Sequence, residues 1–457
     1  MPTIITGASV TSEGIVTNTL GTSNFVAGVN AGNSITSGGN YNTVVGDEAG
    51  TAITTGDRNS AVGMSALVAN TTGSFNAALG YESLKANTTG GQNTGLGDRT
   101  LLANTTGALN TAVGQGSLAA NTTASNNVAV GVAALEANTT GSNNTAVGQA
   151  ALTDNTTGEY NTAVGRQALI DNTTGVRNSA FGDSALANNT TGQYNTALGR
   201  ESLFYNTTGV SNTAVGKDAL ISNTTAGSNT AVGESALYAN TTASSNAAFG
   251  SNTLKACTTG EANASFGAYA SFSNTTGTCN TILGFQTGYY ITTGSGNIVL
   301  GSQTAAGQYS PVFGVVGEDN RIVMGTTVAT NAYVKVAWTV TSDQRDKADI
   351  TDFTHGLDYI NELRPVNYVW DERSNYADGI SDGSKKKDLT QLGFLAQEIE
   401  AVETSLGITN NCVVDKEDVD NLKITETKLI PILVNAIKEL STQNAALAAR
   451  LTTLEEG

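Results

Sequence analysis

The sequence is poor in the residues on which most enzyme and metal sites depend. It has 457 residues, but only three cysteines, four prolines and one histidine, His355. A single histidine excludes nearly every zinc site and every Ser-His-Asp triad that does not use it. The cysteines are odd in number and far apart, so they imply no disulfide framework. We therefore expect no metal and no cofactor.

Positive charge and long apolar runs are also scarce. The chain has 22 basic and 39 acidic residues, for a formal net charge of −17. Such a chain does not attract nucleic acid through bulk charge, so we expect no nucleic-acid partner. No run of about 18 apolar residues occurs, which predicts no membrane insertion. The N-terminus also lacks the basic start and apolar core of a signal peptide.

What the sequence does contain is a repeat of 17 residues. Segments 60–76 and 162–178 align without a gap, and the period holds over most of the chain. Cys257 stands at the one place where an Asn-Thr-Thr triplet loses its asparagine. The period is carried by glycine from Gly46 to Gly301, asparagine from Asn42 to Asn297, leucine from Leu67 to Leu254, and the triplet from Asn70 to Asn274.

Such a repeat predicts a mainly β fold, a parallel β-solenoid or β-roll with one coil per repeat over 24–307. Sixteen coils stacked at strand spacing make a shaft of roughly 75 Å. The repeated glycine marks a backbone position that rejects a Cβ atom. We expect the apolar residues at Val62, Leu67 and their counterparts to point inward. The small residue at Ala61 should allow another backbone to approach.

A coil of 17 residues encloses few side chains, so a single solenoid of this width has little core of its own. We infer that several chains pack side by side, most simply as a homotrimer. The pattern N-T-A-V-G-x-x-A-L resembles the head repeats of trimeric autotransporter adhesins and the repeats of many phage tail fibres. That resemblance covers about 24–307, although the adhesin repeat is shorter. It implies a trimeric β-roll.

The composition changes abruptly after Gly307, where charged residues become frequent. We predict four segments along the chain. They are an N-terminal attachment segment (1–23), the repeat shaft (24–307), a β neck with alternating apolar residues (308–341) and a C-terminal domain (342–457). The first segment is short, so we expect it, or another protein, to join the fibre to a baseplate or adaptor.

Three motifs and a terminal helix mark the C-terminal domain. In order they read S-D-Q-R-D-K (342–347), L-R-P-V-N-Y-V-W (363–370), G-F-L-A-Q-E-I-E (393–400) and a helix ending L-A-A-R-L-T-T-L-E-E. Together they resemble the intramolecular chaperone of endosialidase family, found at the C-termini of phage tail spikes and fibres. The resemblance implies a domain that trimerises, guides folding of the fibre, and then cuts itself off between Thr341 and Ser342.

The same resemblance implies a Ser-Lys dyad, with Ser342 as nucleophile and Lys347 as its base. A lysine acts as a base only when neutral, which requires burial, so assembly into the trimer would switch on cleavage. Asp343 and Arg345 are expected to support the dyad. The alternative is that Ser342 and Asp343 merely cap a helix while Arg345 pairs with a surface carboxylate.

Two departures from the family pattern bear on this activity. Asp346 stands where leucine is usual and adds a negative charge beside Lys347. Gln391 stands where many members carry histidine, and we expect His355 to be a partly exposed helix residue and not its substitute. The enzyme activity expected is a single-turnover autoproteolysis, and no turnover enzyme is expected in the shaft.

The terminal helix carries a heptad pattern that predicts a coiled coil over about 430–455. The seam is apolar except for Asn444, a polar residue of the kind that fixes register and strand number. The alternative is a monomeric amphipathic helix packed on its own domain. The seam positions are Ile430, Leu433, Ile437, Leu440, Asn444, Leu447, Leu451 and Leu454.

Variable positions of the repeat offer candidate binding residues. Phe75, Tyr160 and Tyr194 either present flat rings to sugars or cover a seam between chains. Acidic residues such as Glu82 and Asp98 are scattered over different coils, whereas a glycan-cleaving site needs two carboxylates about 5–10 Å apart in a groove.

These features predict a homotrimeric tail fibre of a virion. We expect it to be made in the host cytoplasm and to adhere to a host surface receptor such as a glycan. The alternative is a structural fibre, spacer or adhesin of a cellular or phage-like injection machine, with a permanently retained trimerisation domain.

Overall fold

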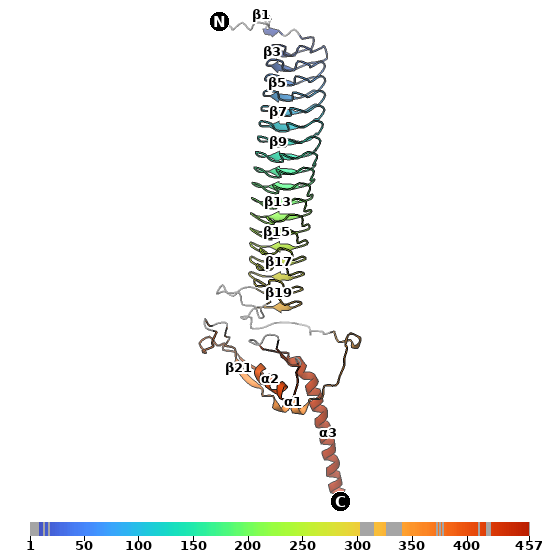
Figure 1. Cartoon of the computed structure of the whole chain (residues 1–457), viewed down its shortest axis with the longest axis vertical. Helices are drawn as coiled ribbons and strands as arrows, with labels where there is room; N and C mark the ends of the chain where they lie inside the picture. Colours follow the sequence, from blue (N-terminus) through green and yellow to red (C-terminus); the bar gives the residue numbers. More distant parts are fainter. Residues whose placement is uncertain are drawn as a thin grey trace. The chain divides into compact units, whose positions relative to one another are not determined.

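The computed structural model describes residues 9–11, 14–16, 19–301, 315–325, 341–371, 373, 376, 379–409, 412–416 and 422–456. The chain divides into two compact units, Met1–Tyr333 and Val334–Gly457. The first is a parallel β-solenoid, drawn from blue to yellow in Figure 1, and the second is a small mixed unit with a long terminal helix.

The solenoid is built from three-residue strands that stack in parallel, each paired with the next along the chain. Residues one repeat apart face each other, so Ala146 in β10 is opposite Ala163 in β11. A short antiparallel hairpin, β1 and β2, precedes this ladder. The strands are β1 (Ser9–Thr11), β2 (Gly14–Val16), β3 (Phe25–Ala27), β4 (Thr43–Val45), β5 (Ser60–Val62), β6 (Ala77–Leu79), β7 (Thr94–Leu96), β8 (Thr111–Val113), β9 (Val128–Val130), β10 (Thr145–Val147), β11 (Thr162–Val164), β12 (Ser179–Phe181), β13 (Thr196–Leu198), β14 (Thr213–Val215), β15 (Thr230–Val232), β16 (Ala247–Phe249), β17 (Ala264–Phe266), β18 (Thr281–Leu283), β19 (Ile298–Leu300) and β20 (Ile322–Met324).

The ladder extends by one coil beyond each end of the exact 17-residue repeat. Strand β3 lies 18 residues before β4, and β20 lies 24 residues after β19, so both strands fall outside the strict period. The predicted neck, 308–341, falls largely outside the described residues. Its described part, 315–325, contains β20 and continues the parallel ladder.

The interior of each coil is narrower than the sequence suggested. The middle residue of each strand, such as Ala61, is buried, and so is Leu67, as predicted. The prediction for Val62 and its counterparts was wrong, because they flank the middle residue and strand neighbours point to opposite faces. Val62 is partly exposed and its counterpart Leu79 is 48% exposed.

At the middle of β7, Gly95 faces side chains and not another backbone, contrary to our expectation that another backbone would approach at this position. At Gly95, a Cβ atom would lie 2.5 Å from Ser83 Oγ and 2.7 Å from Thr100 Oγ1. The two hydroxyls fill the space that alanine occupies in other coils. The interior of a coil is so narrow that a few small side chains fill it.

The repeated glycine behaves as predicted. Gly63 has a φ of +133°, and a Cβ atom there would lie 2.4 Å from the carbonyl oxygen of Gly80 in the next coil. L-residues rarely adopt this backbone conformation, and the neighbouring backbone leaves no room for a side chain. The glycine therefore sets the closest approach between successive coils.

Two ladders of buried asparagines run along the inside corners. In the Asn59 ladder, from Asn42 to Asn297, each backbone N–H donates to the side-chain oxygen one coil before, as from Asn59 to Asn42 at 2.9 Å. Each side-chain amide also donates across its own coil, as from Asn59 Nδ2 to Gly73 O at 2.9 Å. Polar groups buried at these corners are satisfied by their counterparts in the neighbouring coils.

The second ladder, from Asn70 to Asn274, links side chain to side chain, as from Asn87 Nδ2 to Asn70 Oδ1 at 2.8 Å. Cys257 interrupts it. Its thiol donates to Gly260 O at 3.2 Å, and the buried Oδ1 of Asn240 has no hydrogen-bond partner in the described structure. Burial raises the pKa of the Cys257 thiol to about 11, so the residue is protonated at neutral pH.

The second unit packs short elements against a long helix. Its core is formed by Tyr359, Ile399, Val413, Val414, Leu429 and Ile432. The elements are η1 (Gln344–Asp346), α1 (Leu357–Glu362), β21 (Val366–Val369), β22 (Thr390–Gly393), α2 (Ala396–Ser405), β23 (Val414–Asp415), β24 (Lys423–Ile424), η3 (Glu426–Lys428) and α3 (Leu429–Glu456). Strands β21 and β22 pair antiparallel, as do β23 and β24.

The break in the second ladder generates a stability prediction. We expect Cys257→Asn to restore the side-chain hydrogen bond to Asn240 and to stabilise the shaft by about 1 kcal/mol, the usual net value of one hydrogen bond. Thermal unfolding followed by circular dichroism would measure the gain. Cys257→Ala is the control, because it removes the thiol without adding a donor. Equal stability of the two variants would contradict the prediction.

Candidate functional site

The predicted dyad residues lie at the two sides of the short turn η1. Lys347 Nζ donates a hydrogen bond to Ser342 Oγ at 2.6 Å. This distance lies in the range of about 2.6–3.2 Å that a nucleophile and its general base need. The arrangement can transfer the hydroxyl proton of Ser342 to Lys347 when the amine is neutral.

Asp343 and Arg345 pair with each other. Asp343 caps η1 by accepting from the backbone N–H of Arg345 at 2.9 Å, and Arg345 Nη2 lies 2.6 Å from Asp343 Oδ2. The hydrogen bonds from Arg345 hold the pKa of the Asp343 carboxyl below its ordinary value. The capped turn of the alternative interpretation is therefore present, and the same turn brings Lys347 to Ser342.

The dyad residues are exposed to solvent in the single chain, whereas the proposed mechanism requires a buried lysine. Thr341, Ser342 and Lys347 are all exposed. Asp346 is exposed as well, and no ion pair joins it to Lys347 in the part of the chain that the structure describes. The described part of one chain does not supply the burial that the mechanism requires, so any burial has to come from elsewhere.

Gln391, which stands at the position of the family histidine, and His355 both lie outside the turn η1. Gln391 is in β22, where it pairs with Tyr368 of β21. His355 precedes α1 and is not a helix residue, contrary to our expectation, although its side chain is partly exposed as predicted. Its Nδ1 lies 2.6 Å from Asp358 Oδ2, and this hydrogen bond lowers the pKa of the Asp358 carboxyl.

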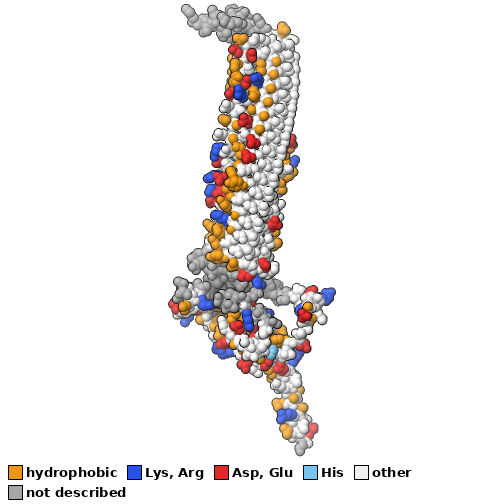
Figure 2. Space-filling model, in the orientation of Figure 1, with side chains coloured by type: hydrophobic (Ala, Val, Ile, Leu, Met, Phe, Trp, Pro, Cys, Tyr) orange, Lys and Arg blue, Asp and Glu red, His pale blue; other side chains and the backbone are white. Residues whose placement is uncertain are grey.

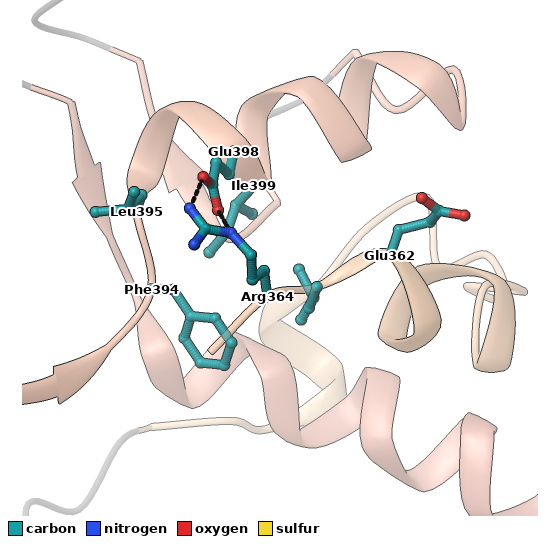
Figure 3. A pocket seen from close by; sticks show the side chains of 7 residues that line it. Glu362, Arg364, Phe394, Leu395, Glu398 and Ile399 are labelled. Carbon is teal, nitrogen blue, oxygen red and sulfur yellow. Dashed lines mark hydrogen bonds and ion pairs between the residues drawn. The ribbon is translucent and has the colours of Figure 1, made fainter. Parts of the chain in front are cut away.

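The second and third sequence motifs meet in the fold. The strand of one motif, β21, pairs with β22, which leads into the other motif. Arg364 forms a two-pronged ion pair with Glu398 beside Phe394, at a small hollow shown in Figure 3. The hollow encloses about 10 Å³, roughly the space of one water molecule, and is too small for a drug-sized ligand. The motifs therefore hold the domain together.

A buried carboxylate is a feature that sequence reasoning missed. Glu403 is completely buried, and its Oε1 accepts from Tyr359 Oη at 3.2 Å and from the backbone N–H of Val413 at 2.7 Å. Its Oε2 has Lys416 Nζ at 3.8 Å as an ion-pair partner. A buried acid needs such partners. The partners lie 10 to 44 residues away in sequence, so no local pattern indicated them.

The predicted coiled-coil helix packs on its domain through the face beside the heptad seam, because each buried residue is one position before a seam residue. Leu429, Ile432 and Ala436 of α3 are buried. The apolar seam residues are exposed in the described chain, from 42% for Leu433 to 77% for Leu454. The alternative of a helix that buries its seam in its own domain is not what the described structure contains.

The shaft also carries an exposed apolar line. We define the outer strand column as the third residue of each strand from β3 to β20, which runs from Ala27 to Met324. All eighteen residues are apolar, and all are exposed or partly exposed. Figure 2 shows hydrophobic and charged side chains together along one edge of the shaft, beside a broad face with little of either.

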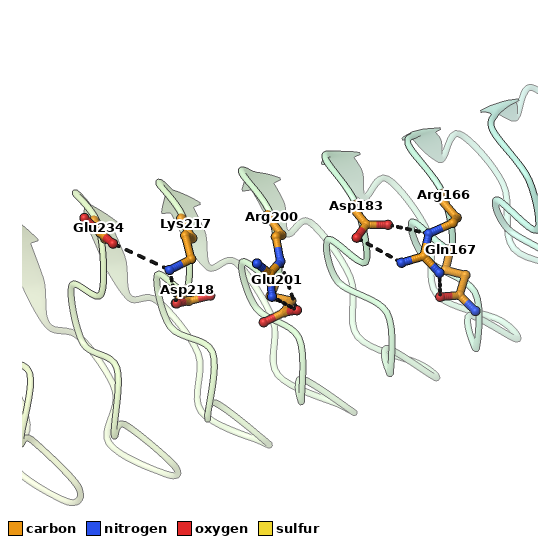
Figure 4. A network of polar contacts seen from close by, with 8 residues as sticks. All are labelled: Arg166, Gln167, Asp183, Arg200, Glu201, Lys217, Asp218 and Glu234. Atoms are coloured by element: carbon orange, nitrogen blue, oxygen red, sulfur yellow. Dashed lines mark hydrogen bonds and ion pairs between the residues drawn. The ribbon is translucent and has the colours of Figure 1, made fainter.

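Charged side chains next to this column pair along the shaft. Figure 4 shows Arg166 with Asp183, and Lys217 with Asp218 and Glu234. Elsewhere Glu82 pairs with Lys85 at 2.7 Å and with Arg99 at 3.3 Å. These carboxylates are therefore engaged with cations, and the two that come together, Asp218 and Glu234, share Lys217.

Among the residues described, no group of three or more His, Cys, Asp or Glu side chains could hold a metal ion. The described helices include none that is long and apolar enough to cross a bilayer. The described cysteines are free, with Cys257 buried and Cys279 exposed.

Comparison with known proteins assigns the C-terminal region. Residues 342–408 match the family model described as chaperone of endosialidase. No curated protein and no solved structure matches the chain. The chain thus carries a chaperone domain of the kind that trimerises fibre-like proteins. Together with the β-solenoid, this domain fits a tail fibre with a C-terminal chaperone, and the resemblance stated from the three motifs is confirmed.

Proposed function

We propose that the chain forms a homotrimeric tail fibre that adheres to a host surface receptor. In this proposal its C-terminal domain drives trimerisation and then releases itself by cleavage between Thr341 and Ser342. The observation that carries the proposal is the exposed seam of α3, a helix in the same compact unit as the residues 342–408 that match a chaperone family. The baseplate or adaptor contact is assigned to the N-terminal segment, and the location to a virion tail.

The seam of α3 supports assembly because its apolar residues have no cover in the described chain. Leu447, Leu451 and Leu454 follow one another at alternating spacings of four and three, as knobs of a coiled coil do. Burial of one such leucine contributes about 2 kcal/mol, and the seam repeats this along the helix. Asn444 is exposed on the same seam and would select the number of strands.

The outer strand column supports side-by-side packing of the shafts. A line of apolar residues that repeats with every coil offers the same contact over the whole length of the solenoid. Exposed apolar patches of this extent mark interaction sites. Within the column Phe249 and Phe266 stack with their centroids 4.9 Å apart, which makes a flat apolar surface for a second copy.

The cleavage step follows from the contact between Lys347 and Ser342. Neutral Lys347 takes the hydroxyl proton of Ser342, and Ser342 Oγ attacks the carbonyl carbon of Thr341. The peptide C–N bond breaks as protonated Lys347 returns the proton to the Ser342 nitrogen, which leaves as an amine, and an ester joins Thr341 to Ser342 Oγ. Water then hydrolyses the ester to the Thr341 carboxylate and the free hydroxyl. Burial of Lys347 by neighbouring chains would favour the neutral amine.

The competing candidate is a structural fibre, spacer or adhesin that keeps its trimerisation domain. It is favoured by the exposure of Lys347 and by Asp346 next to it. In that case the domain remains as a permanent clamp at the end of the fibre.

Cleavage is tested by intact mass. We expect the purified wild-type chain to yield two fragments divided at Thr341–Ser342, while Ser342→Ala and Lys347→Ala remain at 46.6 kDa. Asp346→Leu should cleave faster than wild type, because it removes a negative charge that favours protonated Lys347. Arg450→Leu is the matched surface control, since it lies on α3 away from the turn. A wild-type chain that stays whole would support the retained clamp.

Assembly through the seam is tested by the mass of the particle in solution. In a Ser342→Ala background, which keeps the chain whole, we expect a mass three times that of one chain. Leu447→Asp should shift the population toward monomers, because it places a charge in the apolar seam. Ala449→Asp is the matched control, since Ala449 lies on the opposite side of α3. A trimer that survives Leu447→Asp would show that α3 does not hold the chains together.

The assignment to a virion is tested by co-purification. We expect the shaft polypeptide to remain with particles purified from an infected culture, in a fixed ratio to the major tail proteins. Its absence from particles and its presence on uninfected cells would favour the cellular adhesin.

A further inference from the structure

Three cations of the shaft lie between pairs of aromatic rings. In each case one ring comes from the coil before and the other from the coil after. We call these sites the cation sandwiches. They are Tyr41–Arg58–Phe75, Tyr160–Arg177–Tyr194 and Tyr238–Lys255–Phe272, with cation-to-centroid distances between 5.2 and 5.9 Å.

These three cations differ from all others in the coils. The described solenoid has eight basic residues between 19 and 301, and five of them form ion pairs with carboxylates. Arg58, Arg177 and Lys255 have no carboxylate partner among the described residues. The five paired cations are Lys85, Arg99, Arg166, Arg200 and Lys217.

The repeat itself produces the sandwiches. Residues 17 apart occupy the same place in successive coils, about 4.8 Å apart, which leaves room for a flat cation between two rings. Tyr160, Arg177 and Tyr194 all have left-handed backbone with φ of 56–58°, so they share one conformation at the corner before the strand. The two tyrosine side chains are about half exposed, at 51% and 52%.

Arg177 is held in place while most of its donors stay available. A guanidinium has five N–H donors in one plane, and its faces are covered here by rings. Only one donor is engaged by a described side chain, from Arg177 Nη1 to Tyr194 Oη at 3.1 Å. The remaining donors form an exposed fork of the kind that binds carboxylates. Because the side chain is already ordered, binding costs little further entropy.

The charge around the site limits what can bind. The chain has a net charge of −17, and Glu159 lies next to Tyr160 in sequence. A polyanion would be repelled by this background, whereas a ligand with one negative charge and a neutral body would not. The exposed halves of the tyrosines offer apolar surface to the C–H groups of a sugar ring, and their hydroxyls offer hydrogen bonds.

We propose that the cation sandwiches bind carboxylated sugars, with the carboxylate on the cation and the sugar ring against the flanking aromatic side chains. The inference rests on the proposed function in that such sugars would belong to the surface receptor. The proposed ligand is a uronic acid. Tyr160–Arg177–Tyr194 is the best-ordered of the three sites, because Arg177 is held by two rings and by a hydrogen bond to Tyr194. Arg58 lies seven coils away in the same corner column, roughly 34 Å along the shaft at strand spacing. A polysaccharide whose uronic acids are separated by neutral sugars therefore has the reach to contact both sites without being a dense polyanion.

The test uses the full chain and two probes, methyl β-glucuronide and methyl β-glucoside, which differ in the carboxylate. Binding is followed by saturation-transfer difference NMR. One variant carries Arg58→Gln, Arg177→Gln and Lys255→Gln. The matched control carries Arg99→Gln, Arg166→Gln and Arg200→Gln, so both variants lose three positive charges. We expect wild type and the control to bind the glucuronide in preference to the glucoside.

The sandwich variant should bind the glucuronide about tenfold more weakly, the effect of losing one charge-assisted hydrogen bond of about 1.4 kcal/mol. Equal losses in the two variants would overturn the proposal, because general electrostatics would then explain the binding. Equal binding of both probes by wild type would overturn it too. A sandwich variant that no longer assembles would instead assign the rings to a seam between chains. If the fibre is trimeric and particle-bound but ignores the glucuronide, only this inference fails.

Discussion

The solenoid depends on polar groups that are buried in every coil and satisfied by the next one. Each asparagine of the Asn59 ladder is fully or almost fully buried, and its oxygen accepts from the backbone of the following coil. An isolated coil would leave each asparagine oxygen without the backbone N–H of the next coil, at a cost of roughly 1–3 kcal/mol for each unsatisfied group. The coils therefore stabilise one another in series, and the apolar interior contributes only a narrow line of alanine and leucine.

The narrow interior explains why so much apolar surface remains outside. Only the middle residue of each strand fits inside, so Val62, Leu79 and their counterparts are left on the outer face. The same division appears in α3, where one face packs on the domain and the heptad seam stays exposed. In the described residues, both units thus leave one apolar line uncovered, and partner chains of the same kind are the simplest source of that cover.

Much of this architecture was readable from the sequence because a strict period converts sequence spacing into spatial neighbours. The coils, the glycine corner, the buried Leu67 column and the long C-terminal helix were all predicted. The last coil was assigned to the neck and not to the shaft because an insertion of seven residues before β20 breaks the period. The outward position of Val62 was missed because an apolar residue suggests burial whichever way the strand is turned.

The candidate site shows the same limit. Ser342 and Lys347 are close in sequence, so the motif indicated a pair that the structure brings to 2.6 Å. Glu403 could not be predicted, since its partners come from α1 and from the segment beyond α2. The cation sandwiches did leave a signal, namely a basic residue with aromatic residues 17 positions before and after it. Comparing residues at the same position of successive repeats reveals this pattern.

The uniform coil has a consequence for length. Every corner hydrogen bond and every strand pair joins a residue to its counterpart 17 positions away, so one repeat can be added or removed without changing the contacts of the others. Each such event changes the shaft by about 4.8 Å and leaves both of its ends as they were. The number of repeats therefore sets the length of the shaft in equal steps, and the contacts that each coil makes stay the same.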